Sequence, residues 1–168
     1  MKLIDRDTYL NKLINVKGTP DIKVITGIRR SGKSKLLEEY IEWIKTHESD
    51  ANVIYIDLTL LKFEALKEYH GLNEYIEGRF DRKKSNYVFI DEVQMCEQFE
   101  LTINSLYSTG QYDIYVTGSN AFLLSSDLAT LLTGRTYEIE VYPFSFSEFL
   151  SYYGSSDIQA TFDRYLKE

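Results

Sequence analysis

The feature that most constrains the fold of this chain is a glycine-rich loop between an apolar run and a segment that favours a helix. The loop reads GIRRSGKS over residues 27–34, after the run Ile22–Thr26 and at the start of Lys33–Lys45. Two glycines let the backbone approach an anion closely, so that successive N–H groups point at phosphate oxygens, and the helix adds its positive dipole end. The pattern predicts a phosphate-binding loop for a nucleoside triphosphate.

Nine residues in and beside this loop are the predicted nucleotide contacts. Lys33 is expected to place a compact positive charge on the β- and γ-phosphates. Two interpretations are open for Arg29 and Arg30. An arginine at a loop tip can contact a phosphate or a neighbouring subunit, or it can simply be solvated. The full set is Gly27, Ile28, Arg29, Arg30, Ser31, Gly32, Lys33, Ser34 and Lys35.

Runs of apolar, β-branched and aromatic residues alternate along the chain with longer segments of helical character. This alternation predicts a three-layer α/β fold, in which helices cover both faces of a mostly parallel five-stranded sheet. In the fifth run, apolar residues alternate with Glu138 and Glu140, which is typical of a strand near a sheet edge. The predicted strands are Ile22–Thr26, Val53–Ile56, Tyr87–Ile90, Ile114–Thr117 and Thr136–Val141.

The helical segments fit one globular domain of 168 residues. The last segment stops without a Gly, Asn or Pro to end it, so we expect the chain to be part of a longer one. The predicted helices are Lys33–Lys45, Leu61–Arg79, Cys96–Ser108, Ala121–Leu132, Phe146–Tyr153 and Asp157–Lys167.

A second motif, an apolar strand that ends in two acidic residues, narrows the chemistry. The run Tyr87–Ile90 delivers Asp91 to the carboxyl edge of the sheet, where open α/β sheets hold their ligands. Mg²⁺ takes few protein ligands, so we expect it to be held by Ser34 and Asp91 together with phosphate oxygens. Glu92 is then placed to orient and polarise the attacking water, which predicts hydrolysis.

Two further sets of residues can be interpreted either as functional or as structural. Ser119 and Asn120 follow the fourth strand, where they either sense the γ-phosphate or cap the next helix, and both roles can coexist. Arg135 follows Gly134, a natural left-handed helix end. In a side-by-side homo-oligomer Arg135 would act as a finger on a neighbour's γ-phosphate, and the competing reading pairs it with Glu138 or Glu140.

Charge and cysteine content exclude several classes of protein. A formal net charge of −7 and a pI near 5.0 argue against broad binding to nucleic acid or to an anionic membrane. Cys96 is the only cysteine, so no intrachain disulfide and no thiol metal cluster are expected. No apolar run is long enough to span a bilayer. These features favour a soluble protein of the cytoplasm.

In these residues the chain resembles the P-loop ATPases of the AAA+ type, specifically the prokaryotic AAA-family ATP-binding proteins that carry a DUF4143 region after the ATPase domain. The resemblance spans nearly the whole chain, and it is the order of the motifs that makes it specific. They are ITGIRRSGKSKLL at 25–37, VFIDEVQ at 88–94, VTGSNAFLL at 116–124 and LLTGRTYEIEVYPFSFSEFL at 131–150.

This resemblance implies ATP and Mg²⁺ as cofactors and a sheet ordered 5-1-4-3-2. It makes residues 1–168 an AAA+ ATPase domain, with 143–168 as the truncated start of the following helical region. It places Ser119 or Asn120 at the sensor position and Arg135 in the family's GR turn. AAA+ proteins usually add a helical lid that contributes to catalysis, so slow or no hydrolysis is expected of this chain alone.

The primary hypothesis is an ATP-hydrolysing switch that couples nucleotide state to a protein partner or to its own C-terminal region. One rival is a phosphotransferase acting on a small acceptor, which needs an acceptor pocket and lid arginines that the sequence does not reveal. Another is a non-hydrolysing interaction module that keeps nucleotide as a structural ligand. Release of inorganic phosphate with no phosphorylated acceptor would support hydrolysis against the phosphotransferase. Partner binding that does not depend on nucleotide would favour the interaction module.

Overall fold

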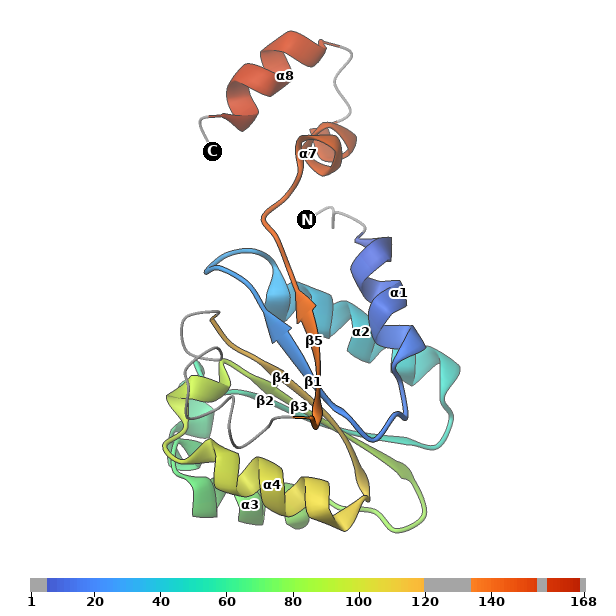
Figure 1. Cartoon of the computed structure of the whole chain (residues 1–168), viewed down its shortest axis with the longest axis vertical. Coiled ribbons are helices and arrows are strands. Elements are labelled where there is room, and N and C mark those ends of the chain that lie inside the picture. The colour runs from blue at the N-terminus through green and yellow to red at the C-terminus, as the bar shows by residue number, and fades with distance from the viewer. Residues whose placement is uncertain (1–5, 120–133, 154–156, 167–168) are drawn as a thin grey trace.

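Five parallel strands form the centre of the molecule. The computed structural model describes residues 6–119, 134–153 and 157–166, and Figure 1 shows a twisted sheet with helices on both faces. The strand order β2-β3-β4-β1-β5 confirms the predicted order 5-1-4-3-2, and β5 is an edge strand as expected. All four pairings are parallel. The strands are β1 Ile22–Thr26, β2 Ala51–Asp57, β3 Ser85–Asp91, β4 Tyr112–Thr117 and β5 Thr136–Glu140.

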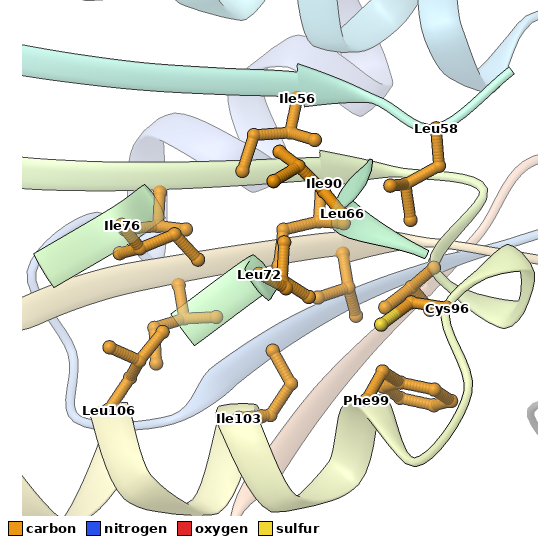
Figure 2. Close-up of a cluster of buried hydrophobic side chains, with 14 of the residues drawn as sticks. Ile56, Leu58, Leu66, Leu72, Ile76, Ile90, Cys96, Phe99, Ile103 and Leu106 are labelled. Atoms are coloured by element: carbon orange, nitrogen blue, oxygen red, sulfur yellow. The ribbon is translucent and has the colours of Figure 1, made fainter. Parts of the chain in front are cut away.

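Helices pack on both faces because successive side chains of a strand point to opposite sides. Along β3, Tyr87 and Phe89 join the cluster under α1 and α2, whereas Val88 and Ile90 join the cluster under α3 and α4. Figure 2 shows this second cluster, where Ile90 of the sheet faces the apolar side of α4. The helices are α1 Asp7–Asn15, α2 Lys33–His47, α3 Tyr69–Glu77, α4 Phe99–Thr109, α7 Phe146–Tyr153 and α8 Ile158–Tyr165.

None of the helices in the described part of the chain is both long and apolar enough to cross a membrane. The predicted helix Phe146–Tyr153 is confirmed as α7, and the predicted helix Ala121–Leu132 lies outside the described residues. The predicted helix Asp157–Lys167 is α8, which begins one residue later because the Asp157 carboxylate caps it through the amide of Ala160.

The single helix predicted over Leu61–Arg79 is wrong. A 3₁₀ helix, Leu61–Leu66, comes first, and Glu68 is extended before α3 begins. The Glu68 carboxylate accepts hydrogen bonds from two amides of the first turn of α3, which fixes the break. Gly71 lets α3 approach the preceding turn, because a Cβ there would lie 2.5 Å from the carbonyl oxygen of Ala65.

The helix predicted over Cys96–Ser108 begins later than expected, and a short 3₁₀ helix, Val93–Met95, precedes it. Cys96 has extended dihedral angles and Gln98 is left-handed, so α4 starts at Phe99. Cys96 is buried, and burial raises the pKa of its thiol to about 12. The thiol is therefore protonated at neutral pH, which suits a packing role and not that of a nucleophile.

A buried ion pair anchors the amino edge of the sheet. The Lys23 ammonium is fully buried and donates to Asp113 Oδ1 at 2.7 Å and to the carbonyl oxygen of Thr19 at 2.6 Å. The second carboxylate oxygen of Asp113 accepts from the amide of Gly18 and from the hydroxyl of Tyr115. A buried pair of this kind is stable when further hydrogen bonds satisfy both partners.

We expect Asp113→Ala to lower the free energy of unfolding by about 3 to 5 kcal/mol, because it leaves the Lys23 charge buried without an opposite charge. Glu42→Ala is the control, because it breaks an exposed ion pair with Lys45 and should cost less than about 1 kcal/mol. Denaturation by urea measures both. Equal losses in the two variants would contradict the assigned importance of the buried pair.

Candidate nucleotide-binding site

The predicted phosphate-binding loop joins the end of β1 to the start of α2. Gly27 has φ +148°, and a Cβ at this position would lie 2.3 Å from the carbonyl oxygen of Val141 and 2.7 Å from Ser31 Oγ. Gly32 is left-handed, with φ +93°, immediately before Lys33 begins the helix. The backbone path of the loop therefore requires glycine at both positions.

The Lys33 side chain folds back into the loop. It is only 4% exposed, and its ammonium donates to the carbonyl oxygens of Gly27 at 3.0 Å and Ile28 at 3.1 Å. Ser31 is also buried, and its hydroxyl oxygen has no hydrogen-bond partner within the described part of the chain. A buried cation and an unsatisfied buried hydroxyl in one loop fit the binding of an anion such as a phosphate group.

The remaining predicted contacts lie on the outside of the loop. Ile28, Arg29 and Arg30 are exposed at its tip, and Arg30 is left-handed with φ +67°. Lys35, on the first turn of α2, is exposed and forms an ion pair with Glu38. The structure therefore separates an inner set of loop residues from these four, which face solvent.

Asp91 meets the start of α2 at the carboxyl edge of the sheet. It is the last residue of β3 and is 1% exposed. Burial raises the pKa of its carboxyl group, while hydrogen bonding from Ser34 and Thr117 lowers it, and the negative charges of Asp57 and Glu92 raise it further. A carboxyl group in this setting fits a cation, because a positive charge would offset both burial and the neighbouring acids.

Ser34 and Asp91 are the two residues predicted to hold Mg²⁺, and the structure brings them together. No group of three or more His, Cys, Asp or Glu side chains suited to a metal occurs among the described residues. A site with one carboxylate and one hydroxyl suits Mg²⁺, which keeps several water ligands and binds phosphate oxygens as well.

Glu92 leaves the strand in a left-handed conformation, with φ 56° and ψ 51°. Its amide donates to Thr117 Oγ1 at 2.9 Å, and its carboxylate accepts a hydrogen bond from the side-chain amide of Gln94. Glu92 is half-buried, so its carboxylate lies at the rim beside Asp91 and retains contact with solvent. A solvent-accessible carboxylate at this rim is compatible with the predicted role of orienting a water molecule.

Thr117, the last residue of β4, links the two acidic residues, and sequence reasoning did not give it this role. Its hydroxyl donates to Asp91 Oδ1 and accepts from the amide of Glu92. The available signal was a hydroxyl residue at the end of a strand, two residues before the predicted sensor residue Ser119. Its meaning depends on β4 lying between β3 and β1, which local sequence does not reveal.

Two other predicted site residues lie at opposite ends of the strands, Ser119 at the carboxyl ends and Arg135 at the amino ends. Ser119 follows β4 at the same edge as Asp91 and is half-buried, and Asn120 lies outside the described residues. Arg135 precedes β5, which runs parallel to β1, so it lies at the edge opposite the phosphate loop of its own chain.

The competing interpretation paired Arg135 with Glu138 or Glu140, and the first of these carboxylates is bonded to another residue. The guanidinium of Arg135 lies 3.5 Å from Asn104 Oδ1 and over the ring of Tyr107, with 5.5 Å to the ring centre. Glu138 instead accepts a hydrogen bond from the Thr26 hydroxyl at 2.9 Å. The side chain of Arg135 is exposed.

Comparison with known sequences shows the family to which this domain is similar. A family model described as an AAA domain matches residues 19–150. An uncharacterized protein of Haemophilus influenzae is 40% identical over 150 residues, and one of Methanocaldococcus jannaschii is 34% identical over 156 residues. The matches cover 88% and 90% of this chain but 38% and 33% of those proteins, so the chain spans about a third of their length.

Solved structures share the fold at low sequence identity. The ORC1 protein of Aeropyrum pernix, solved with DNA, has a TM-score of 0.67 and 11% identity over 89% of this chain and 48% of that one. Hsp104 of S. cerevisiae, solved with ADP, has a TM-score of 0.67 and 20% identity over 91% and 24%. Domain III of Thermotoga maritima DnaA has a TM-score of 0.61 and 18% identity over 93% and 72%.

We expect Thr117→Val to weaken the binding of ATP with Mg²⁺ by roughly tenfold, because the hydroxyl that aligns Asp91 and Glu92 is lost without a change in shape. Isothermal titration calorimetry provides the measurement. Thr102→Val is the matched control, because it removes a buried hydroxyl that bonds the carbonyl oxygen of Tyr69 far from the loop. Unchanged affinity in Thr117→Val would remove Thr117 from the site.

Proposed function

The chain belongs to the AAA domain family, within the AAA+ class of P-loop ATPases, and from this we propose that it is an ATP- and Mg²⁺-dependent hydrolase that works as a switch. The observation that carries the proposal is the meeting of the phosphate loop with Asp91 and Glu92 at one edge of the sheet. A loop with a buried lysine and an adjacent acidic pair contains the groups that ATP hydrolysis requires.

Each group at this edge has a definite task in the proposal. The loop amides and Lys33 hold the phosphates, and Lys33 exchanges its bonds to the carbonyl oxygens of Gly27 and Ile28 for phosphate oxygens. Ser34 and Asp91 hold Mg²⁺, which, when bound, neutralises charge on the β- and γ-phosphates. Glu92 orients the attacking water, and the Thr117 hydroxyl fixes the backbone of Glu92 by accepting a hydrogen bond from its amide.

Nucleotide state is proposed to reach the rest of the protein through the segment after β4. Ser119 and Asn120 lie two and three residues after Thr117, and a hydrogen bond from either side chain to the γ-phosphate would report the loss of that phosphate. Arg135 is proposed to act in a neighbouring subunit, because its place at the opposite edge keeps it from the loop of its own chain.

The output of the switch is proposed to lie beyond the ATPase domain, in a protein partner or in a C-terminal region of the DUF4143 type. The curated relatives are about two and a half to three times as long as their match to this chain. Residues 143–168 are proposed as the start of that following region, and their described part contains α7 and α8. The cytoplasm is the proposed location.

We expect Glu92→Gln to retain ATP binding and to lose nearly all turnover, because the amide keeps the shape of the side chain but cannot act as a base. Lys33→Ala should lose binding itself, because the buried cation of the loop is removed. Equilibrium binding of a fluorescent ATP analogue and release of inorganic phosphate distinguish the two effects. Undiminished turnover in Glu92→Gln would exclude Glu92 from the reaction, and phosphate found on a small acceptor would favour a phosphotransferase.

We expect Arg135→Ala to reduce turnover only where subunits assemble, by about 10³-fold or more if the residue acts as an arginine finger. Mixing this variant with Glu92→Gln tests whether Arg135 acts between subunits. In a mixed pair, the Glu92→Gln subunit can supply its intact Arg135 to the intact Glu92 site of the Arg135→Ala subunit. No recovery of activity in the mixture, or an equal loss in a strictly monomeric sample, would argue against action between subunits.

A further inference from the structure

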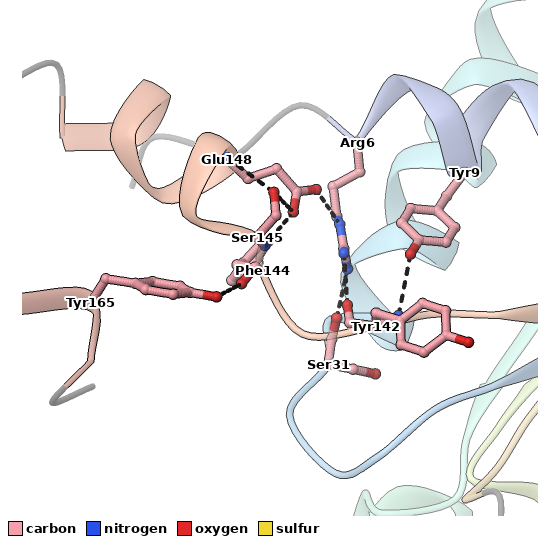
Figure 3. Close-up of polar contacts among 8 residues, drawn as sticks. All are labelled: Arg6, Tyr9, Ser31, Tyr142, Phe144, Ser145, Glu148 and Tyr165. Carbon is pink, nitrogen blue, oxygen red and sulfur yellow. Dashed lines mark hydrogen bonds and ion pairs between the residues drawn. The ribbon is translucent and has the colours of Figure 1, made fainter. Parts of the chain in front are cut away.

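Arg6 is a buried arginine that joins three segments far apart in the sequence. It precedes α1, and it is 6% exposed. Figure 3 shows its guanidinium at the centre of a group of polar contacts. It donates through Nη1 to the carbonyl oxygen of Ser31 at 2.7 Å, through Nη2 to that of Tyr142 at 2.7 Å, and through Nε to Glu148 Oε1 at 2.9 Å.

The position of the guanidinium is fixed by packing as well as by hydrogen bonds. It lies over the ring of Tyr9, with 4.5 Å to the ring centre, and over that of Phe144, with 4.9 Å. A Cβ on Gly32 would lie 3.4 Å from Arg6 Nη1, so the arginine packs directly against the last residue before α2. Two rings and three acceptors leave this side chain a single orientation.

The contact with Ser31 sets the direction of one peptide unit of the phosphate loop. A trans peptide is planar, with its carbonyl and its N–H pointing in opposite directions. Because the Ser31 carbonyl points at Arg6, the N–H of Gly32 points away from it. Loop amides with a fixed direction are the donors that a phosphate-binding loop uses.

The other end of the contact is the first turn of α7. Glu148 accepts from the amide of Ser145 at 2.7 Å, and the amide of Glu148 donates to the Ser145 hydroxyl at 3.2 Å, which forms a capping box. Burial raises the pKa of Glu148, but hydrogen bonds from Ser145 and Arg6 outweigh this and lower it overall. The carboxylate is therefore charged at neutral pH and holds Arg6 and the start of α7 together.

The two C-terminal helices are joined to this turn. The hydroxyl of Tyr165 in α8 donates to the carbonyl oxygen of Phe144 at 2.9 Å, as Figure 3 shows. Phe149 of α7 also packs against Tyr165, with 5.4 Å between the ring centres. A shift of residues 144–148 would therefore be shared by α7 and α8.

We propose that Arg6 is a positioning residue that couples the phosphate loop to α7 and α8. It holds the Ser31–Gly32 peptide on one side and Glu148 on the other, so ATP binding and the docking of α7 stabilise each other. The inference rests on the proposed nucleotide site and adds a route from that site to the C-terminal helices. Because coupling between two binding events is reciprocal, weakening the contact at α7 must also weaken ATP binding.

The test combines ATP affinity, measured with Mg²⁺ present, with hydrogen exchange of the α7 amides. In the unmodified protein, ATP should slow exchange in both α2 and α7. Arg6→Lys replaces the planar guanidinium, whose three nitrogens each bond one acceptor, with a single ammonium nitrogen that cannot reach all three in the same directions. It should therefore lower affinity by about tenfold and abolish the effect of ATP on α7 while α2 still responds. Arg79→Lys, an exposed arginine stacked on Tyr75, is the control and should change neither measurement.

Glu148→Gln provides the second variant, because it weakens the contact from the α7 side and leaves the loop and Arg6 unchanged. It should lower ATP affinity by a few-fold and reduce the effect of ATP on α7. If Arg6→Lys loses affinity but Glu148→Gln behaves as the unmodified protein, Arg6 supports the loop alone and the coupling is refuted. If the unmodified protein binds no ATP, the proposed function fails first, which is a distinguishable result.

Discussion

The parallel register of β1, β3 and β4 is the constraint on which the candidate site depends. Ile25 lies beside Thr117 and Ile90 beside Val116, so the three strands end at the same level. Residues that immediately follow or end these strands must then share one rim, whatever their separation in sequence. The phosphate loop, the acidic pair and the Thr117 hydroxyl meet there, and the apolar faces of the strands hold the register through the two cores.

The sequence predicts this rim well because its signals are local or periodic. The bounds of β1 and α7 match the prediction, and Ser34 approaches Asp91 as expected. The strand order came from the resemblance to AAA+ proteins, because alternation of strands and helices is compatible with several orders. The sequence pattern predicted the loop residues as one group, and it did not separate the buried ones from the exposed residues at the tip.

What the sequence did not predict depends on contacts between distant segments. The first helix, α1, has no side-chain cap at Arg6, and only Leu13 is buried along it, so its local signal is weak. In the sequence, Arg6 cannot be distinguished from an ordinary charged residue near the start of the chain, because its partners lie 25, 136 and 142 positions away. The break before α3 likewise requires a close approach at Gly71 that becomes visible only after folding.

The bonds from Lys33 to the carbonyl oxygens of Gly27 and Ile28 have a thermodynamic consequence for any anion that enters the loop. An anion that binds here replaces hydrogen bonds and does not simply add them, because the Lys33 ammonium already has acceptors inside the protein. The heat released on binding then measures the difference in hydrogen-bond enthalpy between the internal carbonyl oxygens and the oxygens of the anion. It is therefore smaller than the enthalpy of the new hydrogen bonds alone. The same internal acceptors keep the lysine inside the loop, so little side-chain entropy remains to be lost when the ligand arrives.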